Sequence, residues 1–166
     1  MRSREIVVLT AWAISIGVES FTMAQIWTGP LGGAWSAASN WSPNVVPNNA
    51  PPLTFFSPTI PTNGPTVDMG FTVLGLTNMG NVTIPDGGAL GFGAGSLGGA
   101  TALSNTGTIS IAPASPFNSA IVLQGLSTHT WTGNGTIHLT GTGMARIIGG
   151  SSTLSNACNI VGEGNL

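Results

Sequence analysis

Few side chains in this sequence could take part in acid–base chemistry. Downstream of residues 1–24, the carboxylates are Asp68, Asp86 and Glu163, and the only arginine or lysine is Arg146. Glycoside hydrolysis usually requires two carboxylates that face each other across the substrate. Asp86 lies in a Pro-Asp-Gly-Gly turn, where its carboxylate is expected to bond nearby backbone amides. The interval from Asp68 to Asp86 could correspond to one coil, so a calcium-binding or catalytic pair stays open as the minor alternative.

The side chains that could ligate a metal are sparse. His129 and His138 are nine residues apart, and no carboxylate or thiol is close to them in sequence. A metal site needs at least a third ligand, so we interpret both histidines as solvated surface groups, with His138 pointing outward between Ile137 and Leu139. Cys158 is the single cysteine, which excludes an intramolecular disulfide, and we expect it to be a small buried hydrophobe. No metal is predicted.

A Gly-x-Gly-x-x-Gly pattern occurs at Gly93, Gly95 and Gly98. A dinucleotide-binding turn requires a helix directly after the glycines and an acidic residue about 20 positions further on, and the sequence has neither. The chain has no lysine for a phosphate-binding loop. We therefore interpret these glycines as corners of a turn, and predict no cofactor and no enzymatic activity.

Three tryptophans are the candidate binding residues. Trp27, Trp35 and Trp41 are large, rigid and amphipathic, and could form a platform for sugar rings. The competing interpretation is that they plug the first coil of a repeat structure, because a solenoid needs a cap at its end. The sequence favours the plug and leaves the carbohydrate-binding role as the alternative.

Composition restricts the class of protein. Only 5% of residues are charged while 42% are hydrophobic, and the polar character comes from Thr, Ser, Asn and Gly. Disordered chains combine high charge with low hydrophobicity, so a folded β-protein rich in Val, Ile and Thr is predicted instead. A net charge of −2 cannot provide the basic surface that nucleic-acid binding requires, which excludes nucleic acid as a partner.

The N-terminus has the three parts of a secretory signal peptide. Arg2 and Arg4 precede an apolar run over residues 6–18, and small residues precede a cleavage site between Ala24 and Gln25. The run is shorter than the roughly 20 residues that a membrane-spanning helix requires. We predict an exported protein without a membrane span after cleavage; an uncleaved anchor or a buried helix is the alternative.

The rest of the chain divides into two stretches. Residues 25–65 are rich in Trp and Pro and are predicted to form short edge strands and turns that cap the fold. Residues 66–166 contain short alternating segments between Gly- and Asn-rich turns: 72–74, 82–84, 108–111, 121–123 and 136–139. We predict that each of these segments is a β-strand and that helix is nearly absent.

The strand segments resemble one another. Ile109, Ile137 and Ile160 recur at similar intervals in similar Thr- and Asn-containing phrases, and the tripeptide at 103–105 returns at 154–156. These intervals imply a repeat of about 25 residues, typical of a solenoid whose coils bury their apolar faces against each other. We predict an all-β parallel β-helix of four coils with an N-terminal Trp/Pro-rich cap. The alternative is a β-sandwich.

The spaced tryptophans also resemble a known family. The motifs are Trp27-Thr28-Gly29, Gly33-Ala34-Trp35, Asn40-Trp41-Ser42 and Val46-Pro47-Asn48. They are similar to the entry motif of bacterial autotransporter-associated β-strand repeat proteins and related adhesin-like surface proteins. The resemblance implies a long parallel β-helix at the outer cell surface, with a structural or adhesive role and no catalysis. Cell-surface glycans, or further repeats of the same parent chain, are the implied partners.

The chain departs from that family in one respect. Its members are normally much longer and end in a translocation barrel or a membrane-sorting tail, whereas this sequence stops at Leu166 within a repeat. We therefore expect an N-terminal fragment that is truncated at its C-terminus. A carbohydrate-binding or carbohydrate-cleaving extracellular β-helix is the alternative function.

Overall fold

The computed structural model describes residues 21–49, 54–93, 100–126 and 128–162. The two N-terminal arginines and the apolar run of the predicted signal peptide lie outside these ranges. Strands dominate the described residues, and the helix among them is the short 3₁₀ turn η1 (Ala38–Asn40). The strands are β1 (Phe21–Met23), β2 (Ile26–Trp27), β3 (Trp41–Ser42), β4 (Thr54–Phe56), β5 (Thr59–Ile60), β6 (Gly70–Val73), β7 (Gly75–Asn78), β8 (Asn81–Ile84), β9 (Ala89–Phe92), β10 (Thr101–Asn105), β11 (Thr108–Ile111), β12 (Asn118–Leu123), β13 (Thr128–Thr132), β14 (Thr136–Leu139), β15 (Met144–Gly149), β16 (Thr153–Asn156) and β17 (Asn159–Gly162).

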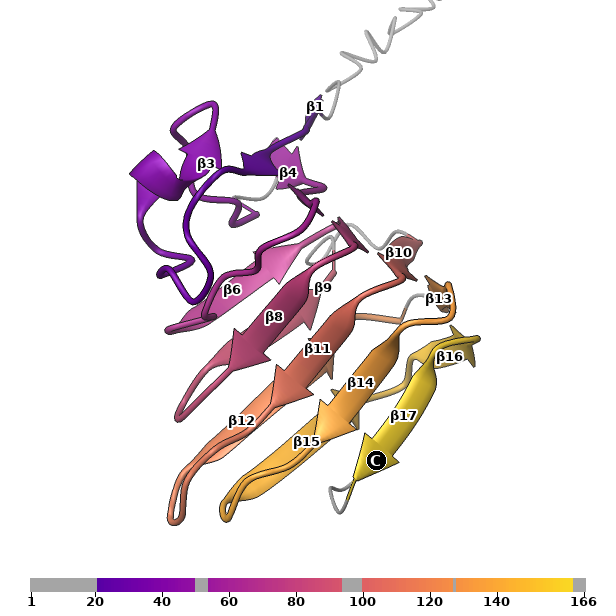
Figure 1. Ribbon diagram of the computed structural model, residues 1–166. Coiled ribbons are helices and arrows are strands. Elements are labelled where there is room, and N and C mark those ends of the chain that lie inside the picture. Colours follow the sequence, from indigo (N-terminus) through magenta and orange to yellow (C-terminus); the bar gives the residue numbers. More distant parts are fainter. Residues whose placement is uncertain (1–20, 50–53, 94–99, 127, 163–166) are drawn as a thin grey trace, which may run out of the picture.

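Three sheets, whose coil strands all pair in parallel, form the faces of a prism. We call the sheet of β6, β9, β12 and β15 the first face, the sheet that contains β7, β10, β13 and β16 the second face, and the sheet of β8, β11, β14 and β17 the third face. The chain visits the faces in this order four times, so each coil contributes one strand to each face (Figure 1). The predicted parallel β-helix is confirmed, and the β-sandwich is not formed.

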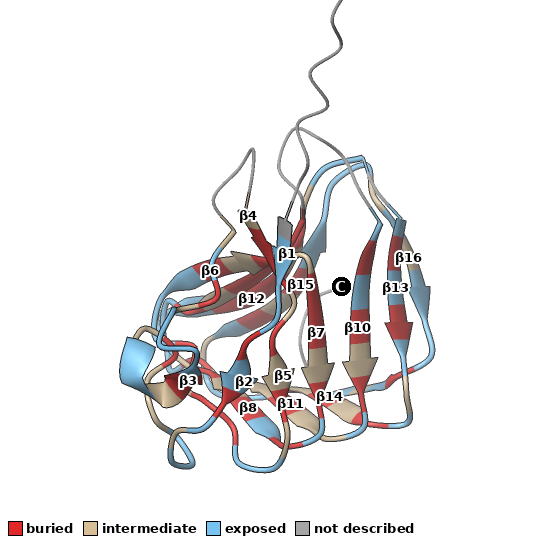
Figure 2. Ribbon diagram, turned by 90° about the horizontal axis from the view of Figure 1, so that it is seen from above, coloured by how far each residue is buried: buried red, intermediate tan, exposed pale blue. Residues whose placement is uncertain are grey.

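In-register stacking places like residues above one another. On the third face, Ile109 pairs with Val82 of the preceding coil and with Ile137 of the following coil, so the interval between the two isoleucines is one coil, as predicted. All three side chains are buried, whereas the residue that follows each of them in its strand points outward. Figure 2 shows the same pattern along the ribbon, with buried residues in the strands and many exposed residues in the connecting loops. Burial of these apolar columns is the main force that stabilises the stack.

The N-terminal segment covers one end of the stack. Strands β2 and β3 pair antiparallel with each other, and β2 and β5 extend the second face beyond β7. Trp27, Trp35 and Trp41 lie in this segment and belong to the same buried cluster as the coil residues. The described parts of the predicted capping segment, residues 25–65, lie above the first coil in Figure 1.

The coils differ in length, and the last one changes register. On the first face, Gly70 pairs with Ala89 and Ala89 pairs with Ala120, so the second interval along the chain is much longer than the first. The tripeptide repeat would place Leu154 in the column of Leu103, but Leu154 pairs with His129. Asn156 and Asn159 pair with Trp131 and Thr136 but are closer together along the chain than these partners are, so the sequence repeat and the structural register no longer coincide there.

Candidate functional site

The two described carboxylates bind turns of the fold. Asp68 accepts hydrogen bonds from the Ser36 backbone N–H at 3.0 Å and from the Ser36 hydroxyl at 2.5 Å. Asp86 accepts one from the Ala114 backbone N–H at 2.5 Å. Asp68 and Asp86 lie at the same corner in successive coils, as their spacing suggested, because Gly70 and Ala89 are paired just beyond them. Each carboxylate therefore stabilises a loop of another segment; Glu163 lies outside the described residues.

Arg146 lines a shallow pocket on the first face together with Gly87 and Gly88, the two residues that follow Asp86. It is half-buried on β15, where it pairs with Ala120 of β12, and β12 separates it from β9. Its guanidinium contacts the thioether sulfur of Met144, at 2.5 Å from Nε. Cleavage of a polysaccharide by a lyase needs a basic group beside its acids, but here the Asp86 carboxylate binds the Ala114 amide and the guanidinium contacts Met144.

The two histidines occupy opposite sides of the wall. His138 points outward between Ile137 and Leu139, as predicted, whereas His129 is fully buried and not a solvated surface group. The sequence Thr-His-Thr-Trp-Thr explains the error, because the alternation that buries Trp131 also turns His129 inward. Within the described ranges, no three His, Cys, Asp or Glu side chains are grouped to hold a metal ion.

His129 is a neutral polar group in the core. Its Nδ1 lies 2.5 Å from the hydroxyl oxygen of Thr101, the residue with which His129 pairs in the preceding coil. Its Nε2 is buried without a hydrogen-bond partner among the described residues. Burial lowers the pKa of His129 below its ordinary value, because the charged imidazolium would lose its hydration there.

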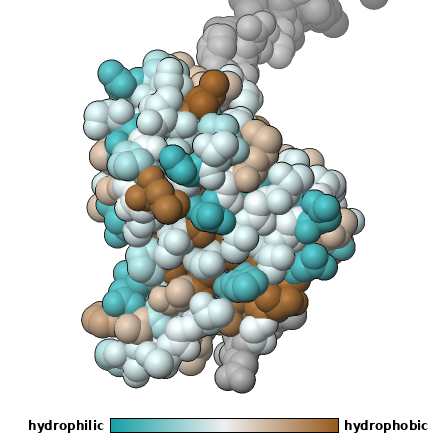
Figure 3. All heavy atoms as spheres, viewed as in Figure 1, coloured by the Kyte–Doolittle hydropathy of each residue, from teal (hydrophilic) through white to brown (hydrophobic). Residues whose placement is uncertain are grey.

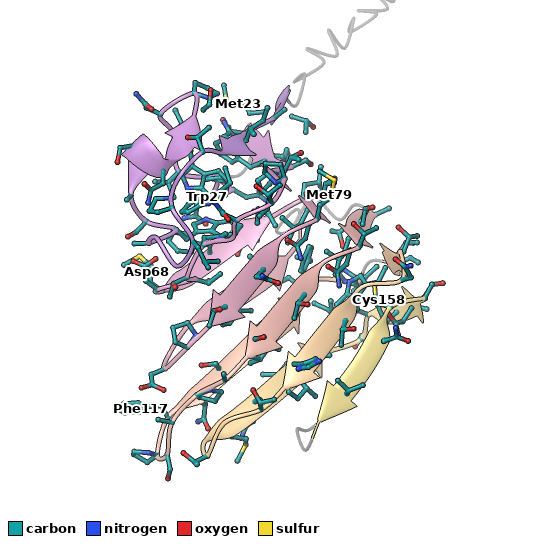
Figure 4. All side chains as sticks on the ribbon, viewed as in Figure 1. Met23, Trp27, Asp68, Met79, Phe117 and Cys158 are labelled. Atoms are coloured by element: carbon teal, nitrogen blue, oxygen red, sulfur yellow. The ribbon has the colours of Figure 1, made fainter. Side chains whose placement is uncertain are left out.

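The tryptophan trio is enclosed. Trp27, Trp35 and Trp41 are 3%, 0% and 1% exposed. The rings of Trp35 and Trp41 meet edge-on with centroids 4.8 Å apart, and the centroids of Trp27 and Trp41 are 5.1 Å apart. The indole N–H of Trp35 donates to the Pro47 carbonyl at 3.1 Å, and that of Trp41 donates to the Trp35 carbonyl at 2.8 Å. The three rings are enclosed at the cap end of the core, where Figure 4 labels Trp27, and none offers a face to a sugar in this structure.

Stacked asparagines form a polar column inside the wall, which sequence reasoning missed. Asn78 and Asn105 are fully buried and paired at the corner between the second and third faces. The Asn78 amide donates to the Asn105 side-chain oxygen at 2.8 Å, and the Asn78 oxygen accepts from the Gly80 N–H at 3.2 Å. The recurrence of Leu-Thr/Ser-Asn-x-Gly at residues 76–80 and 103–107 is the signal that could have revealed this column.

Glycines occupy the same corner of the coils, directly before the strands of the third face. Gly80, Gly107 and Gly135 each directly precede paired residues of the third face. A Cβ on Gly107 would overlap the Gly80 carbonyl oxygen, and one on Gly135 would overlap that of Gly107. The backbones of neighbouring coils therefore approach so closely that glycine is required.

In the fourth coil, Cys158 takes the place that Gly80, Gly107 and Gly135 occupy in the first three coils. It is buried, as predicted, and its thiol donates to the Thr132 carbonyl at 3.3 Å. Burial raises the pKa of the Cys158 thiol, which favours the protonated form.

Only the first glycine of the Gly-x-Gly-x-x-Gly pattern, Gly93, lies within the described residues. Gly93 follows β9, and its amide and carbonyl bind Val73 and the Asn49 side chain. Gly95 and Gly98 lie outside the described residues.

The outer walls of the second and third faces carry rows of hydroxyl, amide and imidazole side chains. On the third face, one row is Thr83, Ser110 and His138, and a second contains Thr108 and Thr136 between two asparagines. On the second face, Thr59, Thr77, Ser104 and Thr132 form a row across four strands. Figure 3 shows pale and teal atoms over much of the third face and a hydrophobic patch over β17. We call these rows of the second and third faces the polar rows.

Comparison with known proteins does not identify the chain. No protein-family model matches it, and neither the curated proteins nor the solved structures contain a match. The similarity to autotransporter-associated repeats therefore stays a prediction from the sequence motifs. Within the described ranges, no helix has the length and apolar character needed to cross a bilayer.

Proposed function

We propose that this chain is an exported, non-catalytic β-solenoid with a structural and adhesive role outside the cell or on its surface. The observation that carries the proposal is the set of polar rows on the second and third faces. Within the described ranges, ionisable acids and arginines are limited to Asp68, Asp86 and Arg146, and both acids bind turn amides. The outer walls thus offer repeated neutral hydrogen-bonding groups.

Such a wall suits a neutral, hydroxyl-rich partner. Hydroxyl and amide side chains both donate and accept hydrogen bonds, as sugar hydroxyls do. The strands of a parallel sheet are spaced about 4.8 Å apart, so each row presents polar groups at a regular interval along the stack. Contacts that are weak individually gain avidity when many form together. We therefore propose cell-surface glycans as one partner.

The last coil supports a second proposed partner, further repeats of the same parent chain. Strands β15, β16 and β17 are the outermost strands of their faces in the described part of the chain. Leu154 and Ile160 belong to the inward columns but are only partly buried. A further coil of the same type would cover both side chains and pair with these edges.

Retention of the purified chain on insoluble polysaccharides tests the adhesive role. The face variant combines Ser110→Lys with Thr136→Lys, two half-buried outward positions of the third face. The matched control places the same charges at Leu126 and Ser151, which are exposed in loops. We expect the parent and the control to be retained, and the face variant to lose at least tenfold in retention.

Two results would overturn this proposal. One is equal retention of the face variant and the control, which would show that the polar rows do not make the contact. The other is release of new reducing ends or unsaturated sugars from the polysaccharide, which would demonstrate cleavage. Far-ultraviolet circular dichroism of all three proteins ensures that a loss of retention is not a loss of fold.

A further inference from the structure

Exposure changes abruptly at the bond where signal cleavage is predicted. Thr22, Met23 and Ala24 are exposed, whereas Gln25 is only 1% exposed. Strand β2 begins at the next residue, Ile26, and carries the first buried tryptophan of the cap, Trp27. The chain thus enters the folded core at the residue that cleavage would make the N-terminus.

Residue 25 remains attached to the fold on its C-terminal side. Its carbonyl accepts a hydrogen bond from the Thr59 N–H at 2.7 Å, and Ile26 pairs with the same residue. Strand β1 pairs with β4 in a separate sheet of two strands. Cleavage before Gln25 would therefore remove β1 and leave the pairing of β2 with β5 in place.

We propose that the mature chain begins at Gln25 and that this glutamine cyclises to pyroglutamate. The inference rests on the proposed export with cleavage after Ala24. The freed α-amine nitrogen attacks the side-chain carbonyl carbon Cδ, and a lactam C–N bond forms. The bond from Cδ to Nε2 breaks, and the nitrogen leaves as ammonia with the proton lost by the amine. The step requires no oxidant, reductant or other reactant.

Burial gives cyclisation a structural benefit at this position. A free α-amino group has a pKa of about 8 and is largely charged at neutral pH, and a charge costs free energy where water is excluded. The side-chain oxygen of Gln25 is already buried without a hydrogen-bond partner among the described residues. An open N-terminal glutamine adds an ammonium group and retains an amide NH₂. The lactam replaces both with one N–H and one carbonyl.

Mass spectrometry of the secreted protein tests the inference. The full chain is expressed in a bacterial host with its own N-terminus, and protein recovered from outside the cytoplasm is digested to give the N-terminal peptide. We expect a peptide that starts at residue 25, is lighter by one ammonia and lacks a labelable α-amine. Gln25→Ala is the matched control, which should be cleaved at the same bond and carry a labelable amine.

The possible results separate the two claims. A peptide that starts at Gln25 with a free amine and an intact amide overturns cyclisation and leaves export unaffected. A chain that starts at Met1, or at another internal residue, overturns the cleavage site and with it this inference. Pyroglutamate aminopeptidase provides a second readout, because it should unblock the N-terminus of the parent chain only.

Discussion

Substitution of Gly107 by alanine should destabilise the stack strongly. A Cβ at this position would overlap the Gly80 carbonyl oxygen and lie 2.8 Å from the Gly80 nitrogen, whereas real Cβ atoms essentially never come within 3.0 Å of such neighbours. The obstacle is the backbone of the adjacent coil, which is paired on both sides and cannot rotate away as a side chain would. Overpacking of this kind costs about 3 kcal/mol.

Urea unfolding measures this cost. With a slope of about 2 kcal/mol per molar urea, a loss of about 3 kcal/mol lowers the midpoint by about 1.5 M. Gly70→Ala is the matched control, because no atom lies within 4 Å of a Cβ built on Gly70. The control should be neutral or stabilised by up to about 1 kcal/mol, since alanine restricts the unfolded chain. Equal midpoints for the two variants would refute the close approach of the coils at this corner.

Three further substitutions address the interior. Asn105→Ala should lower the free energy of unfolding by about 2 kcal/mol in urea titrations, because it removes the nearest of the three oxygens that accept from the buried Asn78 amide and leaves a cavity in its place; exposed Asn134→Ala should stay within about 0.5 kcal/mol of the parent. His129 has a lowered pKa in the folded state, so the unfolded state binds its proton more tightly, and stability should fall as the pH drops below about 6.5. Midpoints measured from pH 8 to pH 5 should show this fall in the parent and a smaller one in His129→Gln. Trp35→Ala should cost about 4 kcal/mol in thermal or urea unfolding, because the fully buried ring contacts Trp41 and Phe71; a change below about 1 kcal/mol would contradict its role in the cap.

Sequence patterns predicted the third face better than the second. Segments 108–111 and 136–139 alternate apolar and hydroxyl residues, and they coincide with β11 and β14. Strand β10 (Thr101–Asn105) was not predicted, because its inward residues are Thr101, Leu103 and Asn105, which show no apolar alternation. A buried polar residue is indistinguishable from an outward one until the coil that satisfies it is known.

The number of residues between stacked positions varies from coil to coil, so the contacts inside the core could not be predicted from the sequence. On the first face, the interval from Gly70 to its partner Ala89 is much shorter than the interval from Ala89 to its partner Ala120. Without a constant period, the sequence does not determine which residues stack. The burial of His129 and the close approach at Gly107 therefore required the register, although the repeat itself predicted the solenoid.

Disulfide cross-linking tests the in-register stacking of the coils most directly. In a Cys158→Ala background, the pair Thr83→Cys and Ser110→Cys joins residues that are direct partners on the third face. The control pair joins Thr83→Cys to a cysteine at Thr108, which also faces outward but is paired with Asn81. Paired positions in neighbouring strands lie within the Cα separation that a disulfide accepts, and positions displaced by two residues do not. Mild oxidation should close the first pair within one chain and leave the control reduced. Failure of the first pair to close, or equal closure of the control, would contradict the stacked-coil account.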